Sequence, residues 1–544
     1  MLQVASEMYP LAKTGGLADV CGALPKALVS AGADVRVIMP AYPSALDGVA
    51  DLRLEVEFGE MLGPHPVRLL RGCLRDGGLV VWLVDCPTLY QRPGTPYLDA
   101  NGDEWPDNAL RYGVLCHVAS RVALGFTGNG WAPDVVHCHD WHTGLVPLLL
   151  RRSHARPRSV FTVHNAAFQG NFPLATAALL ELPRDGEAFA GFEFYGQLSF
   201  LKCGLAFADK VTTVSPTYAR ELATPEFGCG LEGLFASRAA DFSGIMNGID
   251  TEVWNPATDP FLVDRYSAGD PSGKLACKAS LQAELGLRRD VAAPVAIFAS
   301  RVTTQKMADV LLGCLPALMQ RNPRLQFAML GHGDRALETG YAEFARAYAG
   351  RAAVDIGYRE SSAHRLHAGA DFLLHGSRFE PCGLAQLYAM RYGAIPIVRR
   401  IGGLADSVVD AGSDTRGHAT GFVFDAATGD ALEEAVQRCL AVYGAPDDAW
   451  RAMRLRAMAS DFGWKRSAQA YLDLYAQALQ ACAPASDGRT AVERGARALV
   501  RDGVRPLARG RGALEWSRRF PSPSQRTSAH AGGSHETHAQ RDQG

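Results

Sequence analysis

The stretch Ser159-Val160-Phe161-Thr162-Val163-His164-Asn165 shows the pattern on which the fold depends, a short apolar run followed at once by polar residues. Similar runs precede it, and segments of helical spacing such as Asp19 to Ser30 separate several of them; the earlier runs are Val35 to Met39, Leu79 to Val84 and Val135 to His137. Such alternation of strands and helices predicts parallel strands in a doubly wound sheet.

The same alternation begins again in the second half, at Val295 to Ala299, Leu325 to Leu330, Phe372 to Leu374 and Ile395 to Val398. Turn residues accumulate between the halves, from Asn247 to Asp270. We therefore expect an α/β protein with two doubly wound domains, residues 1–247 and 258–461, that bind ligands at the carboxyl ends of their strands. Residues 485–544 lose the apolar periodicity and are expected to form a disordered tail, because they cannot bury enough apolar area.

Composition narrows the class of protein. The 544 residues carry a formal net charge of −2, which gives no global field that favours nucleic acid or an anionic membrane. No apolar run is long enough to span a membrane, and the N-terminus lacks the basic and apolar regions of a secretory signal. The 12 cysteines are scattered singly and are expected to be reduced core residues. We therefore expect a cytoplasmic protein that binds neither nucleic acid nor membranes.

The first loop suited to chemistry is Lys13-Thr14-Gly15-Gly16-Leu17-Ala18-Asp19, which follows the first strand and opens a helix. Its glycines let a ligand approach the backbone, the N–H groups at a helix start attract anions, and Lys13 adds a positive charge. The glycine pair by itself is equally consistent with an ordinary turn.

Two further loops of the first half carry histidines. In His137-Cys138-His139-Asp140-Trp141-His142, three histidines and an aspartate suggest a metal site, although no second cluster supplies the missing ligands. The alternative is that Asp140, at the end of a strand, binds sugar hydroxyls or stabilises a transient positive charge. His164, directly after the strand expected over Ser159 to Val163, is a second candidate sugar contact, with a structural histidine as the alternative.

The second half offers cations and a carboxylate at strand ends. Arg301 and Lys306 suit the neutralisation of a diphosphate leaving group, and no acidic D-x-D tripeptide is placed there to hold Mg²⁺. Solvated surface charges are the alternative. In Phe379-Glu380-Pro381-Cys382-Gly383-Leu384, Pro381 suits a helix start, so that Glu380 faces the ligand; a carboxylate that only faces the helix dipole is the alternative. Gly402-Gly403 is another turn that allows close backbone approach.

The ordered set of motifs resembles that of bacterial glycogen synthases and plant starch synthases, and it runs from about Val4 to about Tyr475. The motifs are Lys13 to Val20, His137 to His142, Val214 to Ala219, Asn247 to Asp250 and Phe379 to Leu384. The resemblance implies a GT-B fold, two Rossmann-like domains facing a cleft, with a last helix within 462–484 that crosses back to the first domain. It also implies transfer of glucose from ADP-glucose to glycogen or another α-1,4-glucan, with retention and without a metal or other cofactor.

The resemblance further implies roles for individual residues. Lys13 resembles the donor-phosphate lysine, and Arg301 and Lys306 resemble the leaving-group clamp. Asp140 and His164 are similar to the residues beside the reacting sugar carbon, and Glu380 to the carboxylate that holds the donor glucose. Substrate binding is also implied for Gly15, Gly16, Asp19, Asn247, Tyr358, Cys382, Gly383, Leu384, Gly402 and Gly403.

Two positions depart from the family pattern, which usually has glycine where this chain has Met307 and threonine where it has Ile401. If position 307 needs a positive φ, methionine would strain the loop that presents Lys306.

Two other functions stay open, a nucleotide-sugar epimerase and an inactive glucan-binding protein. Against the epimerase, the aromatic and glycine-rich stretch from Phe168 to Phe200 suggests a wall for an acceptor.

Overall fold

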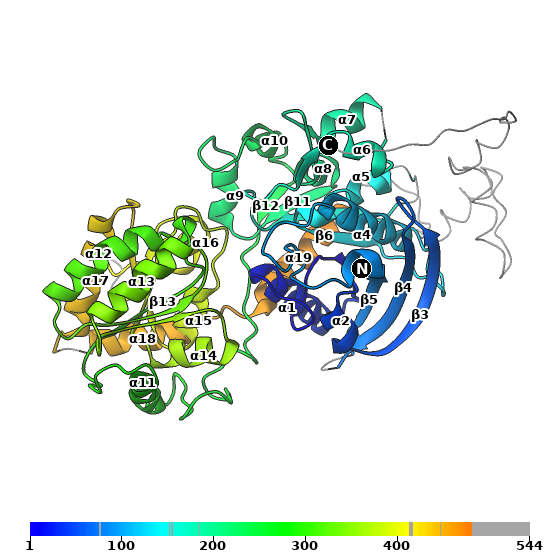
Figure 1. Ribbon diagram of the computed structural model, residues 1–544. Coiled ribbons are helices and arrows are strands. Elements are labelled where there is room, and N and C mark those ends of the chain that lie inside the picture. The colour runs from blue at the N-terminus through cyan, green and yellow to red at the C-terminus, as the bar shows by residue number, and fades with distance from the viewer. Residues whose placement is uncertain are drawn as a thin grey trace, which may run out of the picture. The chain divides into compact units, whose positions relative to one another are not determined.

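The structure is a computed structural model that describes residues 1–480, apart from 76–77, 152, 154–155, 184, 413–416 and 447. The predicted tail, 485–544, lies outside the described residues, as do residues 481–484. The described strands form two large sheets and one small sheet (Figure 1). This arrangement confirms the predicted α/β class with two doubly wound sheets, whereas the boundaries at 1–247 and 258–461 stay predictions.

The first sheet has the strand order β12-β11-β7-β6-β1-β2-β5-β4-β3. Its strands are β1 Leu2–Val4, β2 Arg36–Pro40, β3 Val49–Glu60, β4 Pro66–Leu74, β5 Val80–Asp85, β6 Val135–His139, β7 Arg158–Val163, β11 Lys210–Thr213 and β12 Phe242–Gly244. Strand β4 pairs antiparallel with both β3 and β5, and the other pairs are parallel. The sequence pattern missed β3 and β4. Strand β3, at the edge of the sheet, exposes many side chains, and β4 mixes buried with exposed and half-buried ones, so neither has a continuous apolar run.

Helices of the first half connect these strands, and a small antiparallel sheet, β8-β10-β9, interrupts them. The elements are α1 Gly16–Ser30, α2 Pro43–Gly48, α3 Pro87–Tyr90, α4 Asn108–Ala123, η1 Trp141–Thr143, α5 Val146–Arg151, β8 Asn171–Pro173, α6 Thr176–Leu179, α7 Gly186–Phe192, β9 Glu193–Phe194, β10 Gln197–Ser199, α8 Phe200–Phe207, α9 Pro216–Leu222 and α10 Glu232–Ser237.

The second sheet has the order β15-β14-β13-β16-β17-β18, and all its described pairs are parallel. Its elements are α11 Gly273–Glu284, β13 Val295–Ala299, η2 Thr304–Lys306, α12 Ala308–Arg321, β14 Gln326–Gly331, α13 Arg335–Ala347, β15 Ala352–Ile356, α14 Glu360–Gly369, β16 Phe372–His375, α15 Ala385–Arg391, β17 Ile395–Arg399, α16 Gly402–Ser407, β18 Phe422–Phe424, α17 Gly429–Tyr443 and α18 Ala449–Ala459.

The last described helix, α19 (Trp464–Gln480), packs against the first sheet although it follows the second along the chain. It lies beside α1 and β7 (orange and dark blue helices in Figure 1), and its buried residues Tyr471 and Tyr475 belong to the core of the first half. The core of the second half is a separate cluster around β13, β14, β16 and β17. Within the described residues, no helix combines the length and the apolarity needed to cross a membrane.

Candidate active site

Glu380 lies at the centre of a group of side chains at the ends of the paired strands β13 and β16. Its carboxylate oxygen Oε2 accepts hydrogen bonds from Lys306 Nζ and from Ser377 Oγ at 2.8 Å, and His375 Nε2 lies 3.2 Å from the same atom. Burial opposes ionisation of Glu380, but Lys306 and His375 outweigh it and hold the pKa of this carboxyl well below its usual range. Glu380 is therefore an anion at neutral pH.

Lys306 is presented by the short turn η2, which Met307 ends. Met307 has φ +54°, in the left-handed region, so the position does need a positive φ. Its side chain is nonetheless only 1% exposed and belongs to the core of the second half. Arg301 lies at the exposed start of the same loop, and its described hydrogen bond goes to Gln305 Oε1 at 3.0 Å rather than to Glu380.

Lys13 joins the first loop of the chain to residues of the second half. Its Nζ donates to Asp19 Oδ1 at 2.9 Å and lies 3.5 Å from Tyr358 Oη and 3.6 Å from Glu360 Oε2. Burial lowers the pKa of Lys13, but the neighbouring Asp19, Tyr358 and Glu360 outweigh burial and raise it. Lys13 is thus a cation held by carboxylates from both halves.

The glycine turns bring three loops together. A β-carbon at Gly16 would lie 3.4 Å from Leu384 Cδ1, so the first loop meets the start of α15. The N–H of Gly403 donates to the carbonyl of Glu380 at 3.1 Å, and the N–H of Gly402 donates to Glu221 Oε1 at 2.9 Å. These close approaches explain why glycine occupies the two positions after Ile401, since a β-carbon at Gly402 would collide with the Glu380 carbonyl.

Asn247 and Cys382 are neighbours beneath this turn. Burial raises the pKa of the Cys382 thiol to about 12, and hydrogen bonds with Asn247 oppose that shift. Gly383, the next residue, has φ +72°, where glycine is favoured. The thiol is therefore neutral, and this corner contributes shape and polar groups rather than charge.

Asp140 and His164 follow the paired strands β6 and β7 of the first sheet. Asp140 has φ +62° and caps η1, with its Oδ1 accepting the N–H of Trp141 at 2.9 Å. Burial raises the pKa of Asp140 to about 8, and the nearby Glu7 adds to the effect. His164 Nε2 lies 3.1 Å from His139 Nδ1, and burial lowers the pKa of His164 to about 3, so its ring is neutral.

The histidines that suggested a metal site have protein partners. His137 contacts Tyr475 Oη at 2.8 Å and Thr162 Oγ1 at 2.6 Å, and its ring centroid lies 4.1 Å from that of His139. His142 stacks on Tyr97. Among the described residues, no group of three or more His, Cys, Asp or Glu side chains is placed to hold a metal ion.

Three supporting contacts escaped the sequence analysis. Glu7 is buried and its Oε2 accepts both the N–H and the Oγ1–H of Thr14, at 2.6 and 2.8 Å, which fixes the loop that carries Lys13. Glu360 pairs with Lys13, and Ser377 hydrogen-bonds Glu380. Only Ser377 left a signal in the sequence, because it stands three residues before Glu380 in the same loop.

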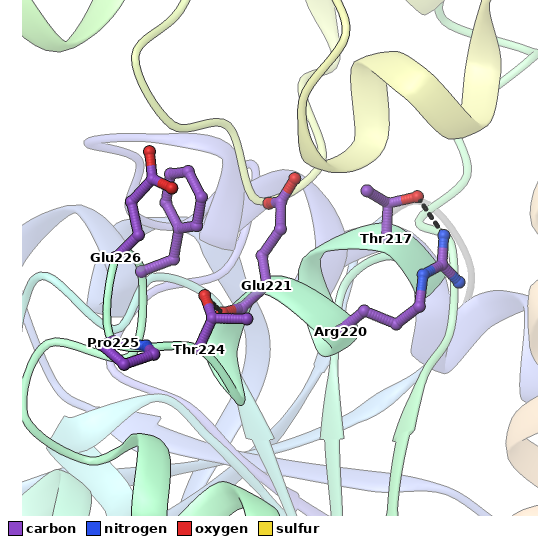
Figure 2. Close-up of a pocket in the computed structure, with 7 residues that line it drawn as sticks. Thr217, Arg220, Glu221, Thr224, Pro225 and Glu226 are labelled. Atoms are coloured by element: carbon purple, nitrogen blue, oxygen red, sulfur yellow. Dashed lines mark hydrogen bonds between the residues drawn. The ribbon is translucent and has the colours of Figure 1, made fainter.

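A surface hollow of about 520 Å³ lies along the end of α9. Figure 2 shows Glu221 and Glu226 extending from this segment in the same direction, with Thr224 and Pro225 between them along the chain. None of the predicted site residues lines the hollow, and its link to them is the hydrogen bond between Glu221 and Gly402. We therefore place the candidate site elsewhere.

The contacts gather the predicted residues into two groups. In the first group, Lys13 bonds to Asp19 and Tyr358, and Gly16 of the same loop lies close to Leu384. Lys306, Glu380 and the Gly402-Gly403 turn belong to this group too, because Glu380 shares a loop with Leu384 and contacts both Lys306 and Gly403. Asp140 and His164 form the second group at the neighbouring ends of β6 and β7. In the described part of the chain, no hydrogen bond or ion pair joins these two groups, and Arg301 contacts neither.

Two Rossmann-like halves built on mainly parallel sheets, with chemistry-bearing loops at the strand ends, have the architecture of glycosyltransferases of the GT-B type. Residues 1–237 match the family model of the starch synthase catalytic domain, and residues 286–451 match that of the glycosyl transferases group 1. These matches, together with 57% identity over 528 residues to a bacterial glycogen synthase, show that the chain belongs to the bacterial glycogen synthase family. The resemblance seen in the sequence, the GT-B fold and the glucosyltransferase class are thereby confirmed.

Individual relatives show how far the similarity extends. The chain is 57% identical to the glycogen synthase of Burkholderia thailandensis over 528 residues, covering 96% of this chain and 97% of the relative. It is 48% identical over 483 residues to the glycogen synthase of Paramagnetospirillum magneticum, covering 87% and 97%. Among solved structures, it is similar to the catalytic domain of starch synthase IV from Arabidopsis thaliana bound to ADP and acarbose, with a TM-score of 0.79, 32% identity and coverage of 88% and 99%.

Proposed function

We propose that this protein transfers glucose from ADP-glucose to the non-reducing 4-hydroxyl of an α-1,4-glucan such as glycogen, with retention of configuration at the sugar carbon. The observation that carries the proposal is the ion pair between the partly buried Lys306 and the buried Glu380 at the ends of two paired strands. It supplies a fixed cation for a leaving phosphate next to a fixed anion for sugar hydroxyls. The glycogen synthases and the ADP-bound starch synthase to which the chain is similar support the same donor and acceptor.

Three cations are the proposed binding groups for the diphosphate. Lys306 is held in place by Glu380, and Lys13 by Asp19, so both are oriented before the donor binds. Arg301 is exposed and bonded only to the neutral Gln305 among the described residues, so it is free to reach a phosphate. Preorganised cations aimed at a developing negative charge stabilise the transition state more than the ground state.

The donor glucose is proposed to lie between the two groups of site residues. Hydrogen bonds described for the Glu380 carboxylate all go to Oε2, which leaves Oε1 to accept from a sugar hydroxyl. Asp140 and the neutral His164 are proposed to lie beside the reacting carbon, the former to stabilise positive charge on the sugar ring and the latter to hydrogen-bond a hydroxyl. Further substrate-binding roles are proposed for Gly15, Gly16, Asp19, Asn247, Tyr358, Cys382, Gly383, Leu384, Gly402 and Gly403.

The proposed reaction needs no covalent intermediate on the protein. The bond between the glucose C1 and the β-phosphate oxygen breaks, and its electron pair stays on the phosphate. The acceptor 4-oxygen forms its bond to C1 from the same face, which gives retention, and its proton passes to the leaving phosphate oxygen. The protein contributes positioning and charge stabilisation. In this scheme the side-chain cations take the place of a metal. The cytoplasmic location and the domain boundaries stay predictions.

Incubation with radiolabelled ADP-glucose and glycogen tests the proposal. We expect label in the polymer, released as glucose by an exo-acting α-glucosidase that attacks non-reducing ends. Conversion of the donor to an epimer would favour the epimerase, and binding of glycogen without labelling would favour the inactive glucan-binding protein. An excess of unlabelled UDP-glucose should compete poorly, and equal competition would overturn the assignment of ADP-glucose.

A further inference from the structure

A tight hairpin joins β9 to β10 and holds an unusual residue. Phe194 pairs with Gln197, so the loop consists of Tyr195 and Gly196 alone, with φ +48° and +79°. Two-residue loops with two positive φ angles favour Asn-Gly or Asp-Gly, because a bulky side chain at the first position meets its own backbone. Tyrosine is therefore the wrong residue for this turn on local grounds.

Packing does not explain the tyrosine either. Its side chain is 84% exposed, and its described ring contact is with the edge of Phe194 at a centroid separation of 4.7 Å. A large aromatic ring that stays in water returns almost nothing of the burial free energy that usually justifies its presence. A residue that breaks a local rule without a gain in packing points to function.

The segment around Cys229 lies beside this ring, and two side-chain amides are hydrogen-bonded to that segment and to each other. A β-carbon at Gly230 would lie 3.5 Å from Tyr195 Cε2, which places the segment around Cys229 beside the ring. Gln169 Nε2 donates to the carbonyl of Cys229 at 2.9 Å, and Asn171 Nδ2 donates to Gln169 Oε1 at 3.1 Å. We call Tyr195, Gln169, Asn171 and Gly230 the hairpin platform.

The hairpin platform is continuous with the candidate active site. Gln169 stands in the loop that leaves β7 at His164, and the next residue, Gly170, packs so closely on Trp141 that a β-carbon there would lie 2.2 Å from Trp141 Cε3. Trp141 directly follows Asp140. The platform is therefore linked through Gly170 and Trp141 to Asp140, which is proposed to lie beside the reacting carbon.

We propose that the hairpin platform binds the α-1,4-glucan acceptor a few glucosyl units back from its reacting end. The Tyr195 ring stacks on one face of a glucosyl unit, and the amide groups of Gln169 and Asn171 hydrogen-bond sugar hydroxyls. An aromatic face beside neutral amides fits a neutral carbohydrate, whereas a phosphate-rich ligand would need cations. The inference rests on the proposed function, which supplies the acceptor and the position of the reacting carbon.

Acceptor kinetics of Tyr195→Ala test the proposal, with maltose, maltoheptaose and glycogen as acceptors at saturating ADP-glucose. We expect KM for maltoheptaose and glycogen to rise about tenfold, because a stacked aromatic residue contributes this much to typical recognition. KM for maltose, which is too short to reach the platform, and KM for ADP-glucose should stay within about twofold. Tyr195→Phe should retain wild-type values, since it keeps the stacking face.

Phe126→Ala is the matched control, because Phe126 is 56% exposed and stands in the loop after α4. It should change no KM value. Tyr195→Asn should lose acceptor affinity like the alanine variant while its Tm equals or exceeds that of wild type, because asparagine suits this turn. Unchanged KM for maltoheptaose in Tyr195→Ala, or an equal rise for maltose, would overturn the platform.

Calorimetric titration with maltoheptaose separates this inference from the proposed function. If wild-type protein transfers no glucose but binds maltoheptaose more tightly than Tyr195→Ala does, the proposed function fails and the platform stands. If wild-type protein elongates glycogen and the variant binds maltoheptaose equally well, the platform fails and the proposed function stands.

Discussion

Asp140 and Glu380 are buried carboxylates at strand ends, one in each half of the protein, yet they differ in charge. Their exposed fractions are 6% and 4%. Burial raises the pKa of Asp140 to about 8, whereas Lys306 and His375 overcome the same burial and hold the pKa of Glu380 well below its usual range. The described hydrogen bond to the Asp140 carboxylate comes from the N–H of Trp141 alone.

The difference shows that partners, rather than depth, decide the charge of a buried acid. Glu380 is an anion before any ligand arrives, so it can accept hydrogen bonds from sugar hydroxyls without a change in protonation. Among the described residues no cation is paired with Asp140, so a positive charge that develops beside its ionised form is strongly stabilised, as the proposed role beside the reacting carbon requires. The predictions below test this contrast, beginning with the largest effect.

Removing Lys306 should abolish the charge pattern around Glu380. We expect Lys306→Ala to lower kcat/KM for ADP-glucose by about 10²-fold or more, because charge-assisted bonds to a leaving phosphate strengthen as charge develops. It should also lower Tm, since Glu380 is left buried without its cation. Arg301→Ala should lower kcat/KM to a similar extent at unchanged Tm, because Arg301 is exposed. Steady-state kinetics and calorimetry measure both effects.

The double variant Lys306→Ala, Glu380→Gln is the control. Neutral glutamine no longer needs the cation, so Tm should recover while activity stays low. A double variant as unstable as Lys306→Ala would show that the lysine stabilises the fold by packing rather than by its charge. Near-normal turnover in both single variants would remove Lys306 and Arg301 from the leaving-group role.

Asp140→Asn should separate activity from stability. We expect kcat/KM to fall about 10²-fold or more, and Tm at pH 8 to rise by about 2 °C or more. The sign follows from the raised pKa of Asp140, about 8 in the folded protein against about 3.9 when unfolded. Between these values the unfolded chain releases the proton and the folded protein keeps it, so the wild type loses stability as pH rises.

Asparagine does not titrate, so the gain in Tm of Asp140→Asn should be absent at about pH 4 and grow towards about pH 8. Calorimetry of both proteins across this range measures it. An equal difference in Tm at every pH would mean that the substitution acts through packing and not through the charge of Asp140.

The pH dependence of wild-type kcat/KM should report the same carboxyl group. If the ionised form of Asp140 is needed, kcat/KM should rise about tenfold per pH unit below the pKa of about 8 and level off above it. Glu380, whose pKa lies far lower, should contribute no change in this range. A flat profile between about pH 6 and about pH 8 would contradict the need for an Asp140 anion.

Sequence alone predicted the strands that carry the site, because buried parallel strands read as continuous apolar runs. Val295–Ala299 is β13 as expected, and the apolar run Ser159 to Val163 falls within β7, Arg158–Val163. The strands β3 and β4 were missed, since both mix buried with exposed or half-buried side chains and leave no such run. Positions of the candidate site residues at strand ends followed from the same pattern.

The sequence pattern did not reveal which side chains contact those site residues. Glu380 and Lys306 stand 74 positions apart, so their pairing depends on β13 lying beside β16. Glu360 and Lys13 come from different halves, and Glu7 is a single acid near the chain start with no spacing that marks it. The sequence suggested a positive φ at Met307 only as one possibility, because the glycine that the family usually has there does not by itself determine the backbone angle.

Met307→Gly tests how the turn that presents Lys306 to Glu380 is maintained. Glycine would relieve a left-handed strain of about 1–2 kcal/mol. It would also remove a side chain that is 1% exposed, a loss of about 2–5 kcal/mol for comparable truncations, and add backbone entropy to the unfolded chain. The loss of the buried side chain should outweigh the relief of strain, so we expect a lower Tm and a change in kcat/KM of less than about threefold. A higher Tm would show that strain dominates at this position.

Chelation should have the smallest effect. In the proposed reaction Lys13, Arg301 and Lys306 neutralise the diphosphate, and Glu380 keeps Lys306 in place, so removal of divalent cations leaves the charge balance unchanged. We expect glucosyl transfer in excess EDTA to equal that in buffer, measured as label incorporated into glycogen. A complete loss restored by Mg²⁺ or Zn²⁺ would contradict this, and His139, whose Nε2 is buried without a described partner, would then be the first ligand to substitute.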